Sequence, residues 1–264
     1  MALLHVNFFA ESLGLSTSMN VLLPQPTSAA QVDMAGAAAR TSYPILYLLH
    51  GWSDDETIWL RRTSIERHAA QLGLIVVMPR VDLSYYQNTE SGMNYWTFIS
   101  EELPRLCKSW FPVAEGRENT FAAGLSMGGY GALRLGLALP EKYSAAASLS
   151  GVADLNYPVK RVINDGPLSA RRVGAIFGND FSVGGTDKDL FHLAAQLKAD
   201  GKPAPQLYQC CGTEDFLYQD NLRFRDHVLN LGLDLIYEEG PGAHDWGYWD
   251  TMIQNVLKWL PIKR

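Results

Sequence analysis

The spacing of apolar residues changes character near residue 43 of the chain. Before that point, residues 3–10 and 17–23 alternate between apolar and polar positions, which predicts two strands that pair as an antiparallel edge. Beyond it, short continuous apolar runs recur, as expected of strands that are covered on both faces. These runs predict strands at 43–49, 74–78, 119–125, 144–149, 206–211 and 233–237.

Segments with helical spacing separate these runs. They predict helices at 56–72, 95–110, 130–139, 218–231 and 246–259. Strands that alternate with helices build βαβ units, so the pattern predicts an α/β protein with a mostly parallel central sheet flanked by helices. No internal repeat and no interdomain linker is visible, and residues 1–264 are therefore interpreted as a single domain.

Two segments interrupt the pattern. Residues 25–40 are rich in Ala, Ser and Gly without periodicity, which predicts a mobile surface loop. Residues 152–205 break the alternation with Gly, Asp, Pro and mixed helical pieces. An insertion after the C-terminal end of a strand is expected to lie over the site where such sheets bind ligands. The alternative is a helical segment that only completes the packing.

Composition and charge limit the classes of function. The 264 residues are 47% hydrophobic and 19% charged, which supports one sizeable core. The net charge of −6 leaves no basic surplus for the phosphates of nucleic acid. No run of Lys and Arg suggests a membrane surface, and no apolar run is long enough to span a bilayer. The expected partner is therefore a small molecule.

The N-terminus and the cysteines indicate the compartment. Residues 1–7 lack the basic and the long apolar regions of a signal peptide, and they are interpreted as the start of the first strand. The three cysteines, Cys107, Cys210 and Cys211, include no Cys-x-x-Cys pair, which fits a reducing environment. We therefore expect a cytoplasmic protein.

The most informative motif is Gly124-Leu125-Ser126-Met127-Gly128. A buried strand is predicted before it and a helix after it, which is the setting of a nucleophilic serine on a sharp strand-to-helix turn. Such a turn strains the backbone at the serine, and only glycines fit around it. It directs the N-terminus of the helix at developing negative charge. The alternative is a Gly-rich turn whose serine only caps the helix.

A serine hydroxyl needs a base that removes its proton. The chain has six histidines: His5, His50, His68, His192, His227 and His244. Only His244 combines the chain order expected of an α/β-hydrolase triad, which is serine, acid and then histidine, with a loop directly after the last predicted strand. We therefore take Ser126 as the candidate nucleophile and His244 as the candidate base, and the other histidines as structural.

The acid that orients the imidazole is expected after another strand. Asp215 follows the strand predicted at 206–211 and precedes a helix. Its alternative role is an N-cap of that helix. Glu214 is its immediate rival, and Asp154, which also follows a strand, is a more distant one. Spacing alone leaves this choice open.

The reaction also needs donors for the oxyanion. The backbone N–H of Met127, the residue after the nucleophile, is the first. The second is expected from the loop after the strand at 43–49, where Gly51 allows a turn and Trp52 supplies its backbone N–H. His50 is then a structural residue of that loop.

No other chemistry competes with this interpretation. The sequence has no Gly-x-Gly-x-x-Gly after a strand and no phosphate loop that ends in Gly-Lys-Ser/Thr. Its histidines lack metal-ligand spacing, so neither a cofactor nor a metal is expected. Tyr85, Tyr86, Tyr95 and Trp96 either line a substrate pocket or belong to the core.

These motifs together resemble the esterase D-like family of α/β-hydrolases, and within it the bacterial tributyrin esterases of the EstA type. The matching stretches cover nearly the whole chain and lie at 48–51, 59–63, 124–132, 211–218 and 242–246. The resemblance implies a carboxylesterase for short-chain acyl esters, acetyl to butyryl, with Ser126, Asp215 and His244 as the triad. It also selects Asp215 over Glu214.

Relatives within the same family leave other substrates open. S-formylglutathione hydrolases and acetyl-xylan or feruloyl esterases are similar, so a thioester or a sugar ester is an alternative substrate. An acyltransferase, in which an alcohol replaces water, is an alternative of another class. The expected partner is a small-molecule ester, and a homo-oligomer is compatible with the sequence.

Overall fold

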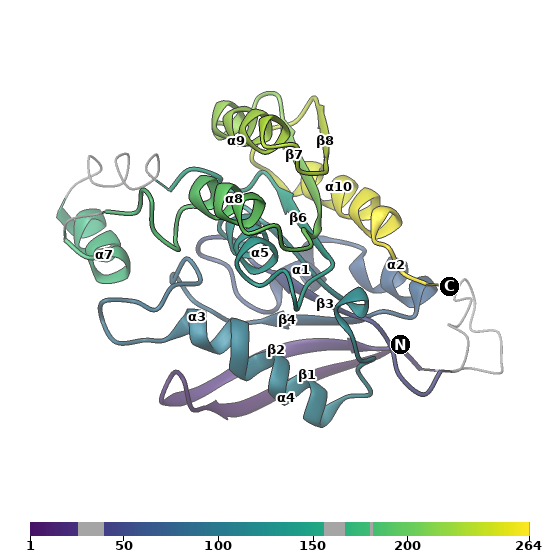
Figure 1. Ribbon diagram of the computed structural model, residues 1–264. Helices are drawn as coiled ribbons and strands as arrows, with labels where there is room; N and C mark the ends of the chain where they lie inside the picture. Colours follow the sequence, from purple (N-terminus) through teal and green to yellow (C-terminus); the bar gives the residue numbers. More distant parts are fainter. Residues whose placement is uncertain (26–39, 156–166, 180–181, 264) are drawn as a thin grey trace.

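The computed structural model describes residues 1–25, 40–155, 167–179 and 182–263, and its main feature is one mixed sheet of eight strands (Figure 1). The spatial order of the strands is β1-β2-β4-β3-β5-β6-β7-β8. β1 and β2 form an antiparallel hairpin, β2 pairs antiparallel with β4, and all further pairs are parallel. The strands are β1 Ala2–Ala10, β2 Leu15–Leu23, β3 Ile45–Leu49, β4 Ile75–Pro79, β5 Thr120–Leu125, β6 Ala145–Leu149, β7 Gln206–Gly212 and β8 Leu235–Gly240.

Helices cover both faces of the sheet (Figure 1). They are α1 Ile58–Arg62, α2 Ile65–Leu72, α3 Tyr95–Thr97, α4 Leu103–Trp110, α5 Met127–Ala138, α7 Pro167–Phe177, α8 Leu190–Ala199, α9 Tyr218–Asn230 and α10 Trp246–Trp259. A π-helical turn, Phe98–Glu102, joins α3 to α4. One apolar cluster packs α1, α2 and α10 on one face, and the other packs α4, α5, α8 and α9 on the opposite face. This double cover explains why the central strands are continuous apolar runs.

The predicted α/β architecture is confirmed, and so is the antiparallel edge at the N-terminus. Within the predicted insertion, α8 packs against α5 and α9, and therefore completes one helical layer. The predicted loop at 25–40 lies almost wholly outside the described residues, as does part of the predicted insertion, at 156–166 and 180–181.

Three element boundaries differ from the prediction. The helix predicted at 56–72 is two helices, because Thr63 is extended and its hydroxyl turns back onto the Trp59 carbonyl at 2.6 Å. The helix predicted from residue 130 begins at Met127, directly after the serine. The strand predicted at 233–237 occupies Leu235–Gly240, because the chain is still leaving α9 at Leu233, whose N–H donates to the Val228 carbonyl.

The sheet brings the sequence motifs to one edge. The segments after β3, β5, β7 and β8 carry Gly51, Ser126, Asp215 and His244, respectively. Parallel strands end on the same side, and ligands of such sheets bind there. Within the described residues, no helix has the length and apolar character needed to cross a membrane.

Candidate active site

Ser126 occupies the sharp turn between β5 and α5. Its backbone has φ 52° and ψ −118°, a conformation that residues with a side chain rarely adopt. Its N–H donates to the Leu149 carbonyl at 3.0 Å, and its carbonyl accepts from the Val152 N–H at 3.1 Å. These bonds to β6 and the segment after it hold the strained turn in place.

Two glycines make this turn possible. A Cβ atom at Gly124 would overlap the backbone of Gly128, and one at Gly128 would overlap the carbonyl group of Leu49. Either side chain would push α5 away from the sheet. The predicted requirement for glycine around Ser126 is therefore seen directly in the packing.

The structure brings the three candidate side chains together in a row. Nε2 of His244 lies 3.0 Å from Oγ of Ser126, and Nδ1 lies 2.8 Å from Oδ2 of Asp215. Because a carboxylate only accepts, Nδ1 carries the proton and Nε2 is left to accept from the serine hydroxyl. The Asp215 side chain is fully buried, and its other oxygen accepts the Leu217 N–H at 2.8 Å.

The two rival acids are engaged elsewhere. The Glu214 carboxylate accepts the Gly242 N–H at 2.6 Å and the Thr213 hydroxyl at 2.7 Å. These bonds, the one from Gly242 first, hold the pKa of Glu214 below its ordinary value. Asp154 forms an ion pair with Arg223 at 3.0 Å. Glu214 therefore joins the segment after β7 to the loop that carries His244.

The segment after β3 runs past the serine. A Cβ atom at Gly51 would lie 3.6 Å from the Cβ of Ser126. Ser53 has φ 68°, so the chain turns sharply just after Trp52. In the described part of the chain, neither the Trp52 N–H nor the Met127 N–H donates to another backbone group. Within those residues, both predicted oxyanion donors are thus without a backbone acceptor.

His50 is buried under this segment, as predicted for a structural histidine. Its Nε2 accepts the Val81 N–H at 3.1 Å, so its Nδ1 carries the proton and donates to the Gly51 carbonyl at 2.8 Å. Burial lowers the pKa of His50 from its ordinary value, and the bond to Gly51 opposes that shift. A neutral ring therefore joins the segments after β3 and β4.

Two aromatic side chains that the sequence did not single out enclose the His244 imidazole. The Phe216 ring lies against it with a centroid distance of 4.6 Å, and Trp249 meets it edge-on at 4.8 Å. Phe216 is 53% exposed, whereas Trp249 belongs to the core. The available signal was the position of Phe216 directly after Asp215, and of Trp249 one helical turn into α10.

A second aromatic group lies beside the segment after β3. The Tyr85 ring is 5.2 Å from Trp52 and 5.5 Å from Phe177 of α7. Tyr85 and Tyr86 both have positive φ, 50° and 55°. The buried Arg134 of α5 supports this strained pair, since its guanidinium donates to the Tyr86 carbonyl at 3.2 Å. Tyr95 is also buried, so the predicted aromatics belong largely to the core.

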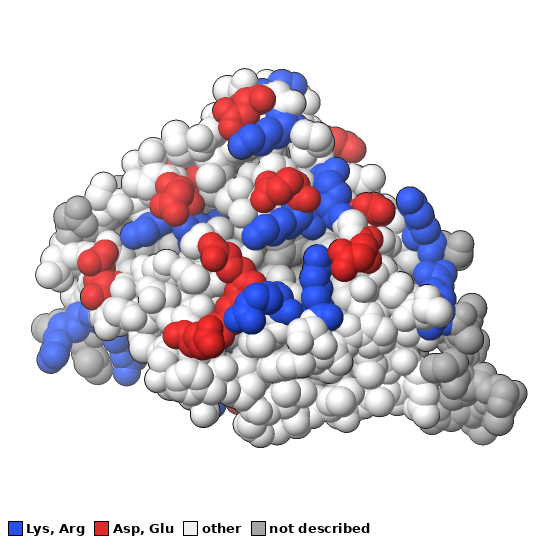
Figure 2. Space-filling view, turned by 60° about the horizontal axis from the view of Figure 1, so that its bottom comes forward, with Lys and Arg blue, Asp and Glu red and all other residues white. Residues whose placement is uncertain are grey.

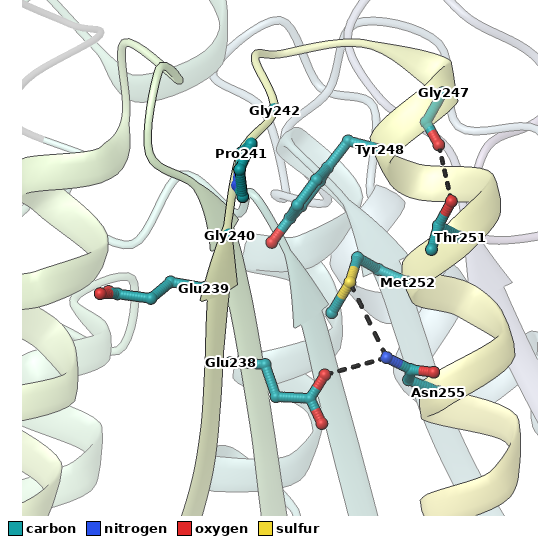
Figure 3. Close-up of a pocket in the computed structure, with 10 residues that line it drawn as sticks. All are labelled: Glu238, Glu239, Gly240, Pro241, Gly242, Gly247, Tyr248, Thr251, Met252 and Asn255. Carbon is teal, nitrogen blue, oxygen red and sulfur yellow. Dashed lines mark hydrogen bonds between the residues drawn. The ribbon is translucent and has the colours of Figure 1, made fainter.

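A cavity of about 420 Å³ opens behind the histidine loop, between β8 and α10 (Figure 3). Its lining consists of Glu238, Glu239, Gly240, Pro241, Gly242, Gly247, Tyr248, Thr251, Met252 and Asn255. The Glu238 carboxylate faces Asn255, and Glu239 points away from the cavity (Figure 3). Because the lining includes neither Ser126 nor His244, this cavity is separate from the row of three side chains.

The described residues offer no cluster of side chains suited to bind a metal ion, since no group of three or more His, Cys, Asp or Glu among them is placed to do so. The three cysteines are buried, and burial raises the pKa of Cys107 to about 12. A thiol in that state is a poor ligand and a poor nucleophile.

Comparison with known proteins places this arrangement in a family. Residues 10–260 match the profile of the family described as Esterase. An acetyl esterase of Caldicellulosiruptor saccharolyticus is 32% identical over 265 residues, which cover 98% of each chain.

Two solved structures from Staphylococcus aureus are similar over almost their whole length. The fluorophosphonate-binding serine hydrolase FphF has a TM-score of 0.88 and 35% identity, with 99% of each chain covered. The S-formylglutathione hydrolase FrmB has a TM-score of 0.85 and 36% identity, with 98% of each chain covered.

Proposed function

The chain belongs to the Esterase family and is a carboxylic ester hydrolase, and we propose that it is a serine esterase for short-chain acyl esters, acetyl to butyryl, with Ser126, His244 and Asp215 as its triad. The observation that carries the proposal is the pair of hydrogen bonds, 3.0 Å and 2.8 Å, that joins the serine to the imidazole and the imidazole to the carboxylate. This geometry meets the distance required between a nucleophile, its base and the group that orients the base.

The acylation half-reaction begins at the serine. His244 Nε2 takes the proton of Ser126 Oγ as that oxygen bonds to the ester carbonyl carbon. Asp215 stabilises the imidazolium that results, and the Trp52 and Met127 N–H groups donate to the oxyanion. When the tetrahedral intermediate collapses, the bond to the alcohol oxygen breaks, and His244 gives its proton to the departing alcohol. The product left on the enzyme is an acyl-serine.

Deacylation repeats these steps with water as the nucleophile. His244 removes a proton from the water as its oxygen bonds to the acyl carbon, and the same amides hold the second oxyanion. Collapse breaks the bond to Ser126 Oγ, and His244 returns the proton to the serine. The carboxylic acid leaves, and no cofactor takes part in either half-reaction.

The short-chain preference has two supports. One is the likeness to an acetyl esterase along nearly the full length of both chains. The other is steric: each methylene that finds no room forfeits about 0.8 kcal/mol of burial. The Trp52, Tyr85 and Phe177 rings lie together beside the segment after β3, and bulky side chains there favour a short acyl pocket.

S-formylglutathione hydrolysis is the second candidate function. It rests on the similarity to an S-formylglutathione hydrolase at 36% identity. Glutathione carries two carboxylates, and the chain has a net charge of −6, which disfavours such a substrate. Further candidate activities are the hydrolysis of acetyl-xylan, the hydrolysis of feruloyl esters and acyl transfer to an alcohol. The preference for tributyrin and the cytoplasmic location also stay predictions.

The test of the triad is Ser126→Ala. The variant should fold normally and lose at least about 10³-fold in kcat, as expected when one member of a triad is removed. A fluorophosphonate should label the wild type and not this variant. Activity near that of the wild type would end the triad proposal.

The test of the substrate is a series of kcat/KM values. Acetyl, butyryl, octanoyl and longer aryl esters are compared with S-formylglutathione, feruloyl esters and acetylated sugars, with and without an added alcohol acceptor. The values should peak at or below butyrate. A maximum at octanoate or beyond contradicts the short-chain proposal, and a thioester value far above every ester selects the second candidate.

A further inference from the structure

The β1 strand is a free edge of the sheet with unusual properties. It is nine residues long, and it stands at the end of the strand order, so that no described strand pairs with its outer side. Its nine pairs with β2 run from Ala2↔Leu23 to Ala10↔Leu15 without a bulge. Natural edge strands are usually short, charged, interrupted by Pro or bulged, because a regular free edge invites another strand to pair with it.

Charge is also missing from this edge. Neither β1 (ALLHVNFFA) nor β2 (LSTSMNVLL) contains a Lys, Arg, Asp or Glu. Figure 2, which brings the bottom of the molecule forward, shows an uncharged lower surface below a band of mixed charge. The opposite edge strand β8 (LIYEEG) carries two glutamates. The chain therefore protects one edge of its sheet with charge and leaves the other unprotected.

The two faces of β1 differ in their cover. Leu4, Val6 and Phe8 pack against the cluster that contains α3 and α4. On the other face, Leu3 is 54% exposed and Phe9 is 60% exposed. Helices α2 and α10 cover that side of the sheet farther in but leave β1 bare. Two large apolar side chains thus lie in solvent beside a free row of backbone groups.

We propose that β1 is a dimer interface at which a second copy of this chain adds its own β1 in antiparallel pairing. An isologous contact about a two-fold axis requires a surface that complements itself. An axis at Val6, the middle residue of the strand, places Leu3 opposite Phe9 of the partner subunit. The same axis pairs Leu4 with the partner's Phe8. The pair of Leu3 and Phe9 on one face, and the pairs of Leu4 with Phe8 and of Val6 with the partner's Val6 on the other, are then all apolar.

The remaining positions also fit this axis. His5 and Asn7 lie opposite each other across the two strands, and no like charges meet there. In the monomer, His5 Nδ1 already contacts Asn20 Oδ1 of β2 at 2.9 Å, so a bond within the same subunit holds the His5 ring. Pairing turns two eight-stranded sheets into one continuous sheet and satisfies the free edge of each.

The size of the edge is sufficient for a specific dimer. Nine residues of strand extend about 30 Å. Perpendicular to the sheet, the edge is about 20 Å deep, because it consists of the strand, one layer of helices and the side chains of the bare face. The area that each copy would bury is therefore about 600 Å². The total, about 1,200 Å², reaches the lower limit of specific interfaces. A reversible dimer is therefore expected.

The experiment measures the oligomeric state of the full chain by sedimentation velocity over a dilution series. The wild type should be a dimer that dissociates on dilution. Phe9→Glu and Leu3→Lys each place a charge against an apolar partner and should each raise the dissociation constant about 100-fold or more. The double variant Leu3→Lys with Phe9→Glu places opposite charges across the axis and should restore the dimer.

Two controls keep the result specific to β1. Ile236→Glu introduces the same charge at an exposed apolar residue, 44% exposed, on the opposite edge strand, and should leave the dimer intact. All variants should keep the near-ultraviolet circular dichroism of the folded wild type. In hydrogen exchange, amides of residues 2–10 should become protected as the protein concentration rises.

Three outcomes would overturn the proposal. The first is a wild type that stays monomeric at every concentration. The second is a dimer that Phe9→Glu leaves intact or that gives residues 2–10 no protection. The third is a double variant as monomeric as the single ones, because this excludes the axis at Val6.

Discussion

The nucleophile elbow, residues 124–128, and the histidine loop, residues 240–245, hold the partner atoms of the proposed reaction in different ways. The elbow is buried throughout, and its strained backbone is fixed by contacts with other backbone groups. No residue of the histidine loop is buried, and only two backbone hydrogen bonds reach it from the segment after β7, donated by the N–H groups of Thr213 and Glu214. Its further contacts are with separate side chains: the Glu214 carboxylate, the Asp215 carboxylate and two aromatic rings. The contacts of the elbow therefore cannot change without movement of the backbone, whereas each side-chain contact of the loop can be removed separately.

The difference predicts two kinds of response to substitution. A side chain added at Gly124 or Gly128 of the elbow meets backbone that cannot move, so it lowers stability and activity together. A change in the histidine loop removes one contact at a time, so it acts on catalysis in steps and leaves the fold intact. Each of the following predictions tests one side of this comparison.

The largest effect is expected for Asp215→Asn, on the loop side. The amide keeps the shape of the side chain but removes the charge that orients and stabilises the imidazole, and kcat should fall about 10⁴-fold. Glu214→Gln is the matched control. It weakens the bonds that Glu214 accepts from Gly242 and Thr213 but leaves the Asp215–His244 pair intact. It should therefore reduce kcat about fivefold, which corresponds to about 1 kcal/mol. The reverse pattern in steady-state kinetics would assign the acid to Glu214.

The next effect is expected for Gly128→Ala, on the elbow side. The added methyl group meets the carbonyl of Leu49 on β3, which cannot give way. Overpacking of this kind should cost about 3 kcal/mol of unfolding free energy, and activity should fall with it. Gly184→Ala is the control, because a Cβ there has nothing within 4 Å. Urea denaturation followed by fluorescence compares the two, and an equal effect would remove the special role of the elbow.

A smaller effect is expected for Phe216→Ala. The ring covers one side of the His244 imidazole, and an aromatic contact is worth about 1 kcal/mol, so kcat should fall about fivefold with little change in stability. Leu229→Ala, at a residue 49% exposed on α9, is the matched truncation and should change nothing. An unchanged kcat in Phe216→Ala would show that the histidine loop does not need this contact.

The smallest effect concerns pH and His50. Burial holds the pKa of the folded His50 below its ordinary 6.5. Between that lowered pKa and about 6.5, the unfolded chain binds a proton that the folded chain does not, so stability falls as the pH drops through this window. The urea midpoint of the wild type should therefore fall more below about pH 6.5 than that of His50→Gln. Parallel curves for the two proteins would contradict the neutral buried ring.

The central part of the fold was predictable because its signals are local. Continuous apolar runs separated by helical spacing follow from strands covered on both faces, and β5, β6, β7 and α10 lie where these runs predict them. The glycines around Ser126 are equally local, since the turn itself excludes a side chain. At the boundary between α1 and α2 a contact distant in the sequence adds to the local turn at Thr63, because the Ser64 N–H donates to the Asp250 carboxylate at 3.0 Å.

Local patterns in the sequence were sufficient to predict the α/β architecture, the strained turn at Ser126 and the order in which serine, acid and histidine follow one another. The folded chain shows which of two adjacent carboxylates meets the imidazole, because Glu214 and Asp215 share a turn and their side chains leave it in different directions. It alone placed Phe216 and Trp249 around His244 and left one edge of the sheet bare. The spacing of residues along a chain gives the order of the elements and the period of each one. The direction in which a side chain points and its exposure to solvent arise only when distant segments pack together.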